Sequence, residues 1–261
     1  MMSNQSGVTL LTTVQQLYDN NRFLDAFRES AEYWKPSTSI QNLSVDELIL
    51  GGRLAARLGG GRLSRRLLRT AYAREPDNPR LRYFTMNIRR CRWRVLDNLR
   101  EFEQNPDLCP EDPEMQAAWL AFHAVNWAFL RDFTSAHHCL ERALNLQSRH
   151  AWVTACESDV LGLEDRWPEA LQRAQLAWKI NPGAPFAAKS LSTSLLNLGR
   201  VEEAGQWLAE ASTDCQSYEV VHLACWYQSA LAETLDGGGH SFEPLFCEPN
   251  WQKSFTVFSC S

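Results

Sequence analysis

The chain has 261 residues, of which 44% are hydrophobic and 11% aromatic, and its formal net charge is −5. This apolar content excludes a disordered chain, because disorder requires low hydrophobicity. No run of about 18 apolar residues occurs, so we expect no membrane-spanning helix. The N-terminus lacks a basic segment followed by an apolar core, so we also expect no secretion signal and a cytoplasmic location.

The eight cysteines have no spacing that is typical of a redox or metal site. No two of them form a C-x-x-C pair or combine with histidines at zinc-ligand intervals. His137 and His138 are adjacent, but neighbouring residues of a helix point about 100° apart and cannot chelate one ion together. We therefore expect reduced cysteines, no metal and no cofactor.

Positive charge is concentrated in one stretch of the sequence. Residues 53–100 contain fourteen arginines against Glu75, Asp77 and Asp97, a net charge of +11, whereas the segments before and after it are negative. A concentration of one sign of charge favours a partner of the opposite sign. This stretch is therefore the first place to look for anion binding.

Three loosely repeated units are expected in the first part of the chain. Residues 21–26 are typical of a turn followed by the start of a second helix. A second unit lies between the glycines at 59–60 and the prolines at 76 and 79, and a third covers residues 80–105, where apolar side chains recur at helical spacing. Corresponding positions are 38 residues apart, from Ala26 to Ser64 and from Asn98 to Ala136.

A strict period of 34 residues follows. Phe133, Trp167 and Val201 are spaced by this period. Each is followed three residues later by one alanine and ten residues later by another, which gives the set Ala136, Ala143, Ala170, Ala177, Ala204 and Ala211. A fixed period of this length predicts stacked helix hairpins.

Each unit of the regular segment predicts two helices joined by a tight turn. The units cover residues 117–146, 152–182 and 186–211, and Pro182 ends the second of them because proline lacks the amide donor. One more helix is expected at 219–235. We therefore expect a repeat domain over residues 7–235 and an irregular tail over 236–261. The tail either folds back on the last repeat or begins a further domain.

Two sequence motifs carry a resemblance to a known family. They are Trp167-Pro168-Glu169-Ala170 with Ala177 and Asn181-Pro182, and the segment Leu198–Ala204 with Ala211. With these motifs the chain resembles the tetratricopeptide repeat family, although Ala124, Ser158 and Ser192 replace the glycine of its first helix. The resemblance implies an all-α, right-handed α-solenoid of antiparallel helix hairpins, with about six hairpins and a final helix.

The resemblance also implies that the first helix of each hairpin lines a concave groove that binds a partner. The matching positions are Arg53, Arg57, Arg80, Tyr83, Asn87 and Arg90 in repeats two and three, and Trp152, Phe186, Lys189 and Tyr227 in later repeats. Arginine pairs with carboxylates through its planar guanidinium, and aromatic side chains anchor apolar ones. We therefore expect a protein or peptide partner, and an acidic one would suit the arginines. The alternative is a solvated arginine-rich face with aromatic residues that serve the core.

Three functional hypotheses remain open at this point. The first is a non-catalytic scaffold for protein–protein interaction, since no Ser/His/Asp or Cys/His arrangement for nucleophilic catalysis is evident. The second makes the chain the repeat arm of a larger multidomain enzyme. The third is a nucleic-acid-binding array, because Tyr83, Phe84 and Trp93 are interleaved with arginines. A pI near 5.7 and the acidic run at 101–114 argue against the third.

Overall fold

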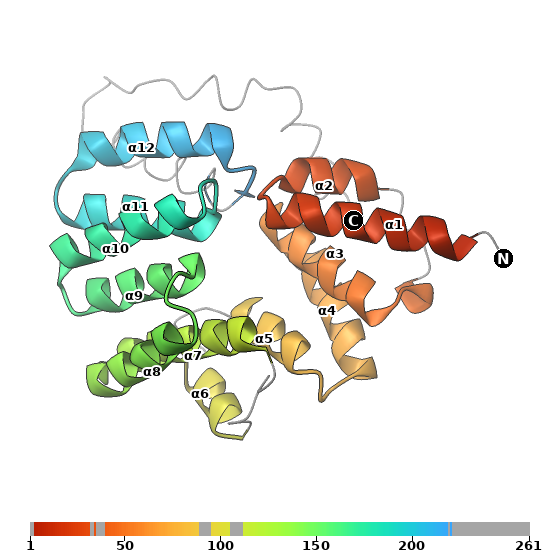
Figure 1. The fold of residues 1–261 in the computed structure, drawn as a ribbon, viewed down its shortest axis with the longest axis horizontal. Coiled ribbons are helices and arrows are strands. Elements are labelled where there is room, and N and C mark those ends of the chain that lie inside the picture. The colour runs from red at the N-terminus through yellow and green to blue at the C-terminus, as the bar shows by residue number, and fades with distance from the viewer. Residues whose placement is uncertain are drawn as a thin grey trace. The chain divides into compact units, whose positions relative to one another are not determined.

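The computed structural model describes residues 3–31, 34, 40–88, 95–104, 112–218 and 220 of the chain. These residues form α-helices and one short 3-10 helix, Ile40–Asn42, and contain no strand (Figure 1). The predicted all-α fold is therefore confirmed. The α-helices are α1 (Ser3–Asp19), α2 (Phe23–Ser30), α3 (Val45–Arg57), α4 (Gly61–Arg74), α5 (Pro79–Ile88), α6 (Val95–Gln104), α7 (Pro113–Phe129), α8 (Phe133–Leu146), α9 (Ala151–Leu163), α10 (Trp167–Ile180), α11 (Pro185–Asn197) and α12 (Val201–Asp214).

Successive helices pair into hairpins, each with a first and a second helix. Thus α1 packs on α2, α3 on α4, α7 on α8, and α9 on α10. The turn inside a hairpin recurs almost unchanged, because one residue adopts a left-handed backbone in each. These residues are Asn21, Gly59, Arg131, Asp165 and Gly199, with φ between 59° and 82°. The last three are one 34-residue period apart, so the sequence repeat is also a repeat of turn geometry.

Hydrogen bonds explain why this turn is so uniform. In the α9–α10 turn, Arg166 N donates to Leu161 O at 2.9 Å, and Asp165 N donates to Gly162 O at 3.1 Å. The α11–α12 turn repeats both bonds at Arg200 and Gly199. Such bonds satisfy the carbonyls that the end of a helix leaves open, and they need one left-handed residue.

Small residues occupy the contact between the two helices of a hairpin. Ala136, Ala170 and Ala204 are each 0% exposed, which agrees with a close approach of the two backbones. The matching positions of the less regular hairpins hold Ala26, Ser64 and Asn98, which are also buried. Asn98 Nδ2 donates to Asn126 Oδ1 on α7 at 3.1 Å, so the largest of these substitutes has a buried polar partner.

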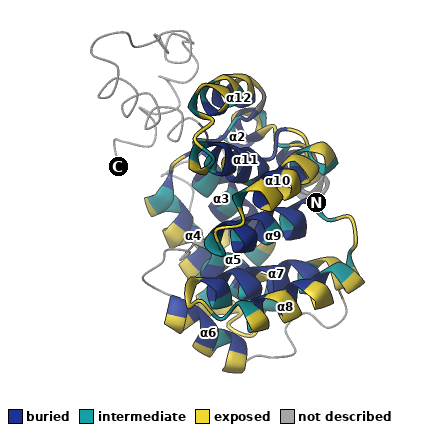
Figure 2. Cartoon of the chain, turned by 90° about the vertical axis from the view of Figure 1, so that its left-hand side faces the viewer, coloured by how far each residue is buried: buried dark blue, intermediate teal, exposed yellow. Residues whose placement is uncertain are grey.

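The contacts divide the chain into two compact units. Unit 1 combines Met1–Glu75 with Leu208–Ser261, and unit 2 covers Pro76–Trp207. In unit 2 the first helices α7, α9 and α11 pack on one another in sequence, and α10 packs on both α9 and α11. In Figure 2 these first helices are mostly buried, whereas α8 and α10 carry exposed outer faces.

Unit 1 is discontinuous in sequence. Its core includes Val14, Phe23 and Leu54 from the first hairpins. Residues that follow α12 cover the helix ends of the same hairpins: Gln216 Oε1 accepts from Leu24 N at 3.0 Å, and Ser217 Oγ donates to Arg57 O at 3.4 Å. The N-cap residue of α2, Arg22, makes no capping hydrogen bond with its side chain, so Gln216 supplies this cap instead.

Two sequence predictions about the end of the chain concern residues beyond the described part. The helix expected at 219–235, apart from Val220, and the tail at 236–261 lie outside the described residues. The boundaries predicted for the repeat domain therefore stay a prediction. None of the described helices is long and apolar enough to cross a membrane.

Candidate functional site

The residues predicted to bind a partner are distributed over both units. Arg53 and Arg57 belong to α3 of unit 1, whereas Arg80, Tyr83, Asn87, Trp152, Phe186 and Lys189 belong to unit 2. Arg90 and Tyr227 lie outside the described residues.

The two arginines of α3 lie against aromatic rings of the first hairpin. The Arg53 guanidinium carbon is 4.4 Å from the centroid of the Tyr18 ring, and that of Arg57 is 5.9 Å from the centroid of Phe23. Tyr18 and Phe23 themselves pack edge to face, with 5.1 Å between centroids. Cations over aromatic faces are attracted by the ring quadrupole, so both arginines contribute to the contact between α3 and the first hairpin.

These neighbouring arginines shift the pKa of Tyr18. Burial by itself would raise the pKa of the Tyr18 phenol, because it penalises the charged form. The charges of Arg53 and Arg57, and the hydrogen bonds that both donate to the phenol oxygen, outweigh burial and lower the pKa below its usual value. The α3 arginines thus have intramolecular roles as well as partly exposed side chains.

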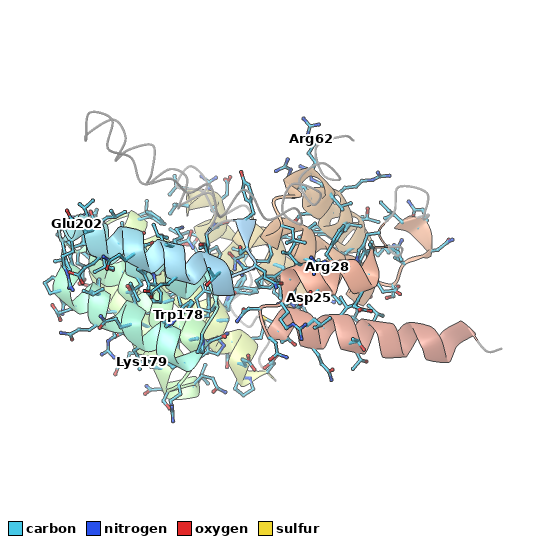
Figure 3. The ribbon with its side chains drawn as sticks, turned by 90° about the horizontal axis from the view of Figure 1, so that it is seen from above. Asp25, Arg28, Arg62, Trp178, Lys179 and Glu202 are labelled. Atoms are coloured by element: carbon cyan, nitrogen blue, oxygen red, sulfur yellow. The ribbon has the colours of Figure 1, made fainter. Side chains whose placement is uncertain are left out.

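A second set of arginines lies on the other helix of the same hairpin. Arg62, Arg65, Arg66 and Arg69 are all exposed on α4, and we call them the arginine stripe. None of the four has an ion pair among the described residues, and the sequence of α4 contains no Asp or Glu. Arg62 projects away from the ribbon in Figure 3. Sequence analysis placed these residues within the basic stretch 53–100 but did not select them individually, although their spacing of three, four and seven is a detectable signal.

In unit 2, α5 places its predicted residues in three different environments. Arg80 is exposed at the start of the helix. Tyr83 is buried, with 6% exposure, and its ring packs edge to face on Phe122 at 6.2 Å between centroids. Asn87 is partly buried and donates from Nδ2 to Tyr83 Oη at 3.4 Å. Tyr83 thus belongs to the core of unit 2.

The later first helices bring three predicted residues together. Trp152 on α9 and Phe186 on α11 form an edge-to-face pair whose centroids are 5.2 Å apart. Both rings are partly exposed, and Lys189 is exposed one turn after Phe186. Ser190 Oγ donates to Asp159 Oδ1 at 2.9 Å and ties α11 to α9 beside them. We call Trp152, Phe186 and Lys189 the first-helix face of unit 2.

A cysteine–histidine pair, which sequence analysis did not find, lies between α7 and α8. Cys139 Sγ is 3.9 Å from His123 Nδ1, and the His123 ring stacks on Phe102 at 4.1 Å between centroids. The two residues are sixteen apart in sequence, and neither motif spacing nor periodicity links them.

The protonation states of this pair oppose nucleophilic chemistry. Burial, assisted by the charge of Arg142, lowers the pKa of His123 to about 4. Burial raises the pKa of the Cys139 thiol above its usual value, against an opposing effect of Arg142. Near neutral pH the pair is therefore a thiol beside a neutral imidazole, whereas a cysteine nucleophile requires a thiolate.

Metal-ligating side chains are paired with other groups instead of clustered. His137 Nε2 lies 2.5 Å from Glu164 Oε1, and His150 Nε2 lies 3.5 Å from Glu114 Oε1. Within the described residues, no group of three or more His, Cys, Asp or Glu side chains is arranged to hold a metal ion.

Among the comparisons with known proteins, those with solved structures identify a similar fold. No protein-family model and no curated protein matches the sequence. A solved structure of a thermophilic tetratricopeptide repeat protein from Thermus thermophilus superposes with a TM-score of 0.55 and 19% identity, over 72% of this chain and 99% of that one. A tetratricopeptide repeat protein from Parabacteroides merdae gives a TM-score of 0.44 and 12% identity, over 98% of this chain and 99% of that one.

The likeness to the Thermus structure supports the helix-hairpin fold described above. In its fold, the chain is a tetratricopeptide-repeat-like protein built from helix hairpins.

Proposed function

We propose that the chain is a non-catalytic scaffold that binds a peptide segment of a partner protein on the first-helix face of unit 2. The observation that carries this proposal is the pair of Trp152 and Phe186, which joins two successive repeats at 5.2 Å between ring centroids. A helical-repeat fold supports it, since such folds present extended surfaces made from several repeats.

The chemistry of this face suits an extended peptide with one apolar and one acidic side chain. The two rings hold each other in place and are only partly buried, so an apolar side chain can pack on them at a low cost in side-chain entropy. The exposed ammonium of Lys189 lies one helical turn further along α11 and can pair with a carboxylate.

A binding role is favoured over catalysis by the His123–Cys139 pair. Both of its pKa shifts favour the uncharged forms of the two residues. The groups available on the first-helix face, two aromatic rings and one ammonium, recognise side chains but do not form a nucleophile with a general base.

Peptides selected from a phage-displayed random library against the wild-type chain test the proposal. We expect the selected peptides to bind the Phe186→Ala and Lys189→Glu variants at least about tenfold more weakly. Lys179→Glu is the matched control, because Lys179 is an exposed lysine on the outer helix α10 (Figure 3). Fluorescence anisotropy gives the affinities, and equal binding to all three variants would contradict the proposal.

A further inference from the structure

We infer that the arginine stripe on α4 is a second docking surface, which binds an acidic α-helix of a partner protein. This surface belongs to unit 1 and to a second helix, so it is separate from the first-helix face proposed above. The four arginines lie on one side of α4 and have no ion pair among the described residues. Their spacing also matches that of carboxylates along a second helix.

The four arginines occupy one side of α4. With 3.6 residues per turn, Arg62, Arg65, Arg66 and Arg69 fall within an arc of about 100°. The buried residues of the helix, Ser64, Leu67, Leu68 and Ala71, lie on the opposite side and pack toward α3. The stripe is therefore the outward face of the hairpin, and its side chains are exposed.

The positive charge of this face is uncompensated within the described residues. Elsewhere an arginine directly before a helix has a carboxylate in the first turn of that helix, as Arg166 has Glu169 and Arg200 has Glu203, both at 2.5 Å. α4 has no carboxylate, and its arginines are neighbours at spacings of three and four. Like charges at these spacings repel each other, so a ligand that neutralises them relieves a repulsion that the fold itself leaves in place.

The spacing of the stripe fits carboxylates on another helix. From Arg62 to Arg69 the helix rises by about 10 Å, or two turns. Glutamates at positions i, i+3, i+4 and i+7 of a partner helix cover the same length with the same arc. Each guanidinium then faces a carboxylate, which it can bind through two parallel hydrogen bonds.

The stripe is less suited to single-stranded nucleic acid. Such ligands are bound by stacking bases on exposed aromatic rings between the basic groups. The only aromatic residue of α4, Tyr72, is partly buried, and the exposed residues of α4 besides the stripe are Ala73 and Arg74. The net charge of −5 also repels a long polyanion from the rest of the chain.

A designed peptide provides the test. The probe is a fluorescent, helix-favouring alanine-rich peptide with glutamates at i, i+3, i+4 and i+7, and its comparison peptide has the same composition with the glutamates distributed around the helix. We expect the wild-type chain to prefer the striped peptide, and Arg65→Glu/Arg69→Glu to weaken its binding by about tenfold or more at low salt. Substitution of all four arginines by glutamine gives a second variant without charge reversal, and we expect it to weaken binding in the same direction.

Arg142→Glu/Arg149→Glu is the matched control, since both residues are exposed on the other unit and the change in net charge is the same. Unchanged binding of the peptide by this control supports the inference. Equal affinity for the two peptides, or equal losses in the α4 and control variants, would overturn it. Tighter, stripe-dependent binding of a short single-stranded DNA would overturn it in favour of nucleic acid. Stripe-dependent self-association in sedimentation would overturn it in favour of a second copy of the chain.

Discussion

The arginines of α3 and α4 in unit 1 differ from those of unit 2 in their surroundings. Beside the hairpin turns both units pair an arginine with a carboxylate three residues later, as Arg22 does with Asp25 at 2.9 Å in unit 1 and Arg166 with Glu169 at 2.5 Å in unit 2. Within the helices of unit 2, Arg173 pairs with Glu157 of the adjacent helix at 3.2 Å. In unit 1, Arg53 and Arg57 lie over aromatic rings, and the arginine stripe on α4 has no ion pair among the described residues. The number of arginines in a segment therefore does not tell which of them are available to a partner.

The contrast is sharpest inside the α3–α4 hairpin. The side of α3 that faces the first hairpin meets Tyr18, whose phenol accepts hydrogen bonds from Arg53 and Arg57. The outer side of α4 meets solvent. Two sets of arginines that are close in sequence thus have different roles, one in cohesion of unit 1 and the other, by our inference, in recognition.

The largest effect is expected from the α3 arginines, whose ring contacts and hydrogen bonds to Tyr18 stabilise unit 1. We expect Arg53→Ala/Arg57→Ala to lower the free energy of unfolding of unit 1 by about 2 kcal/mol, through loss of the two ring contacts and of the hydrogen bonds to Tyr18. Urea unfolding followed by circular dichroism measures this change.

A second readout identifies the cause of that loss. Because Arg53 and Arg57 lower the pKa of Tyr18, its phenol should ionise at higher pH in the double variant, as ultraviolet titration of tyrosinate would show. The phenolate form is favoured by folding, so these arginines add stability as the pH rises toward the unfolded value of about 10. An unchanged titration together with an unchanged free energy would contradict the cohesive role.

An intermediate effect is expected at an ion pair of unit 2. Burial raises the pKa of Glu157, although Arg173 and then His137 act in the opposite direction, and Glu157 Oε2 is buried without a hydrogen-bond partner. We expect Glu157→Gln to stabilise unit 2 by roughly 0.5–1 kcal/mol at pH 7, because the neutral amide removes a buried charge that its partner does not fully compensate.

The pH dependence of this gain follows from the direction of the shift. A raised pKa means that folded protein binds the proton more tightly than unfolded protein does. The wild type therefore has its full stability below the unfolded pKa of about 4.3 and loses part of it as the pH rises through the folded value. The advantage of the variant should vanish in acid and appear toward neutrality, and an advantage that is independent of pH would contradict this cause.

The smallest effect is expected at the arginine stripe. Replacing Arg62, Arg65, Arg66 and Arg69 by glutamine should change the free energy of unfolding by less than about 0.5 kcal/mol, since surface residues without partners contribute little. We expect a slight increase, because the substitution removes repulsion between like charges. Thermal unfolding beside the α3 double variant measures the difference. A loss as large as that of the α3 variant would mean that the stripe is structural and would remove the contrast between the two helices.

Sequence analysis predicted the hairpins because the signals that define them are local. One buried alanine recurs in each 34-residue period, at positions 136, 170 and 204. These alanines and the turn at Gly199 can each be recognised from the sequence of a single hairpin. The left-handed turn residues Arg131 and Asp165 were less accessible to prediction, because neither is a glycine and only the repeat places them in register with Gly199.

The candidate sites were harder to predict because they depend on contacts between elements. Trp152 and Phe186 were both among the predicted groove residues, but their contact with each other spans two repeats and was not predicted. The partners of Arg53 and Arg57 lie on the preceding hairpin, and His123 meets Cys139 across two helices. Residue type and spacing along one helix do not show which neighbour a side chain will find.

The discontinuity of unit 1 also has a consequence for synthesis of the chain. The ribosome delivers α1–α4 first, but Gln216 and Ser217, which cover the ends of α2 and α3, emerge only after the whole of unit 2. Unit 2 is contiguous and can complete its contacts during translation, whereas unit 1 must wait with its helix ends open. The hairpins that are synthesised first are thus the last to receive all of their contacts.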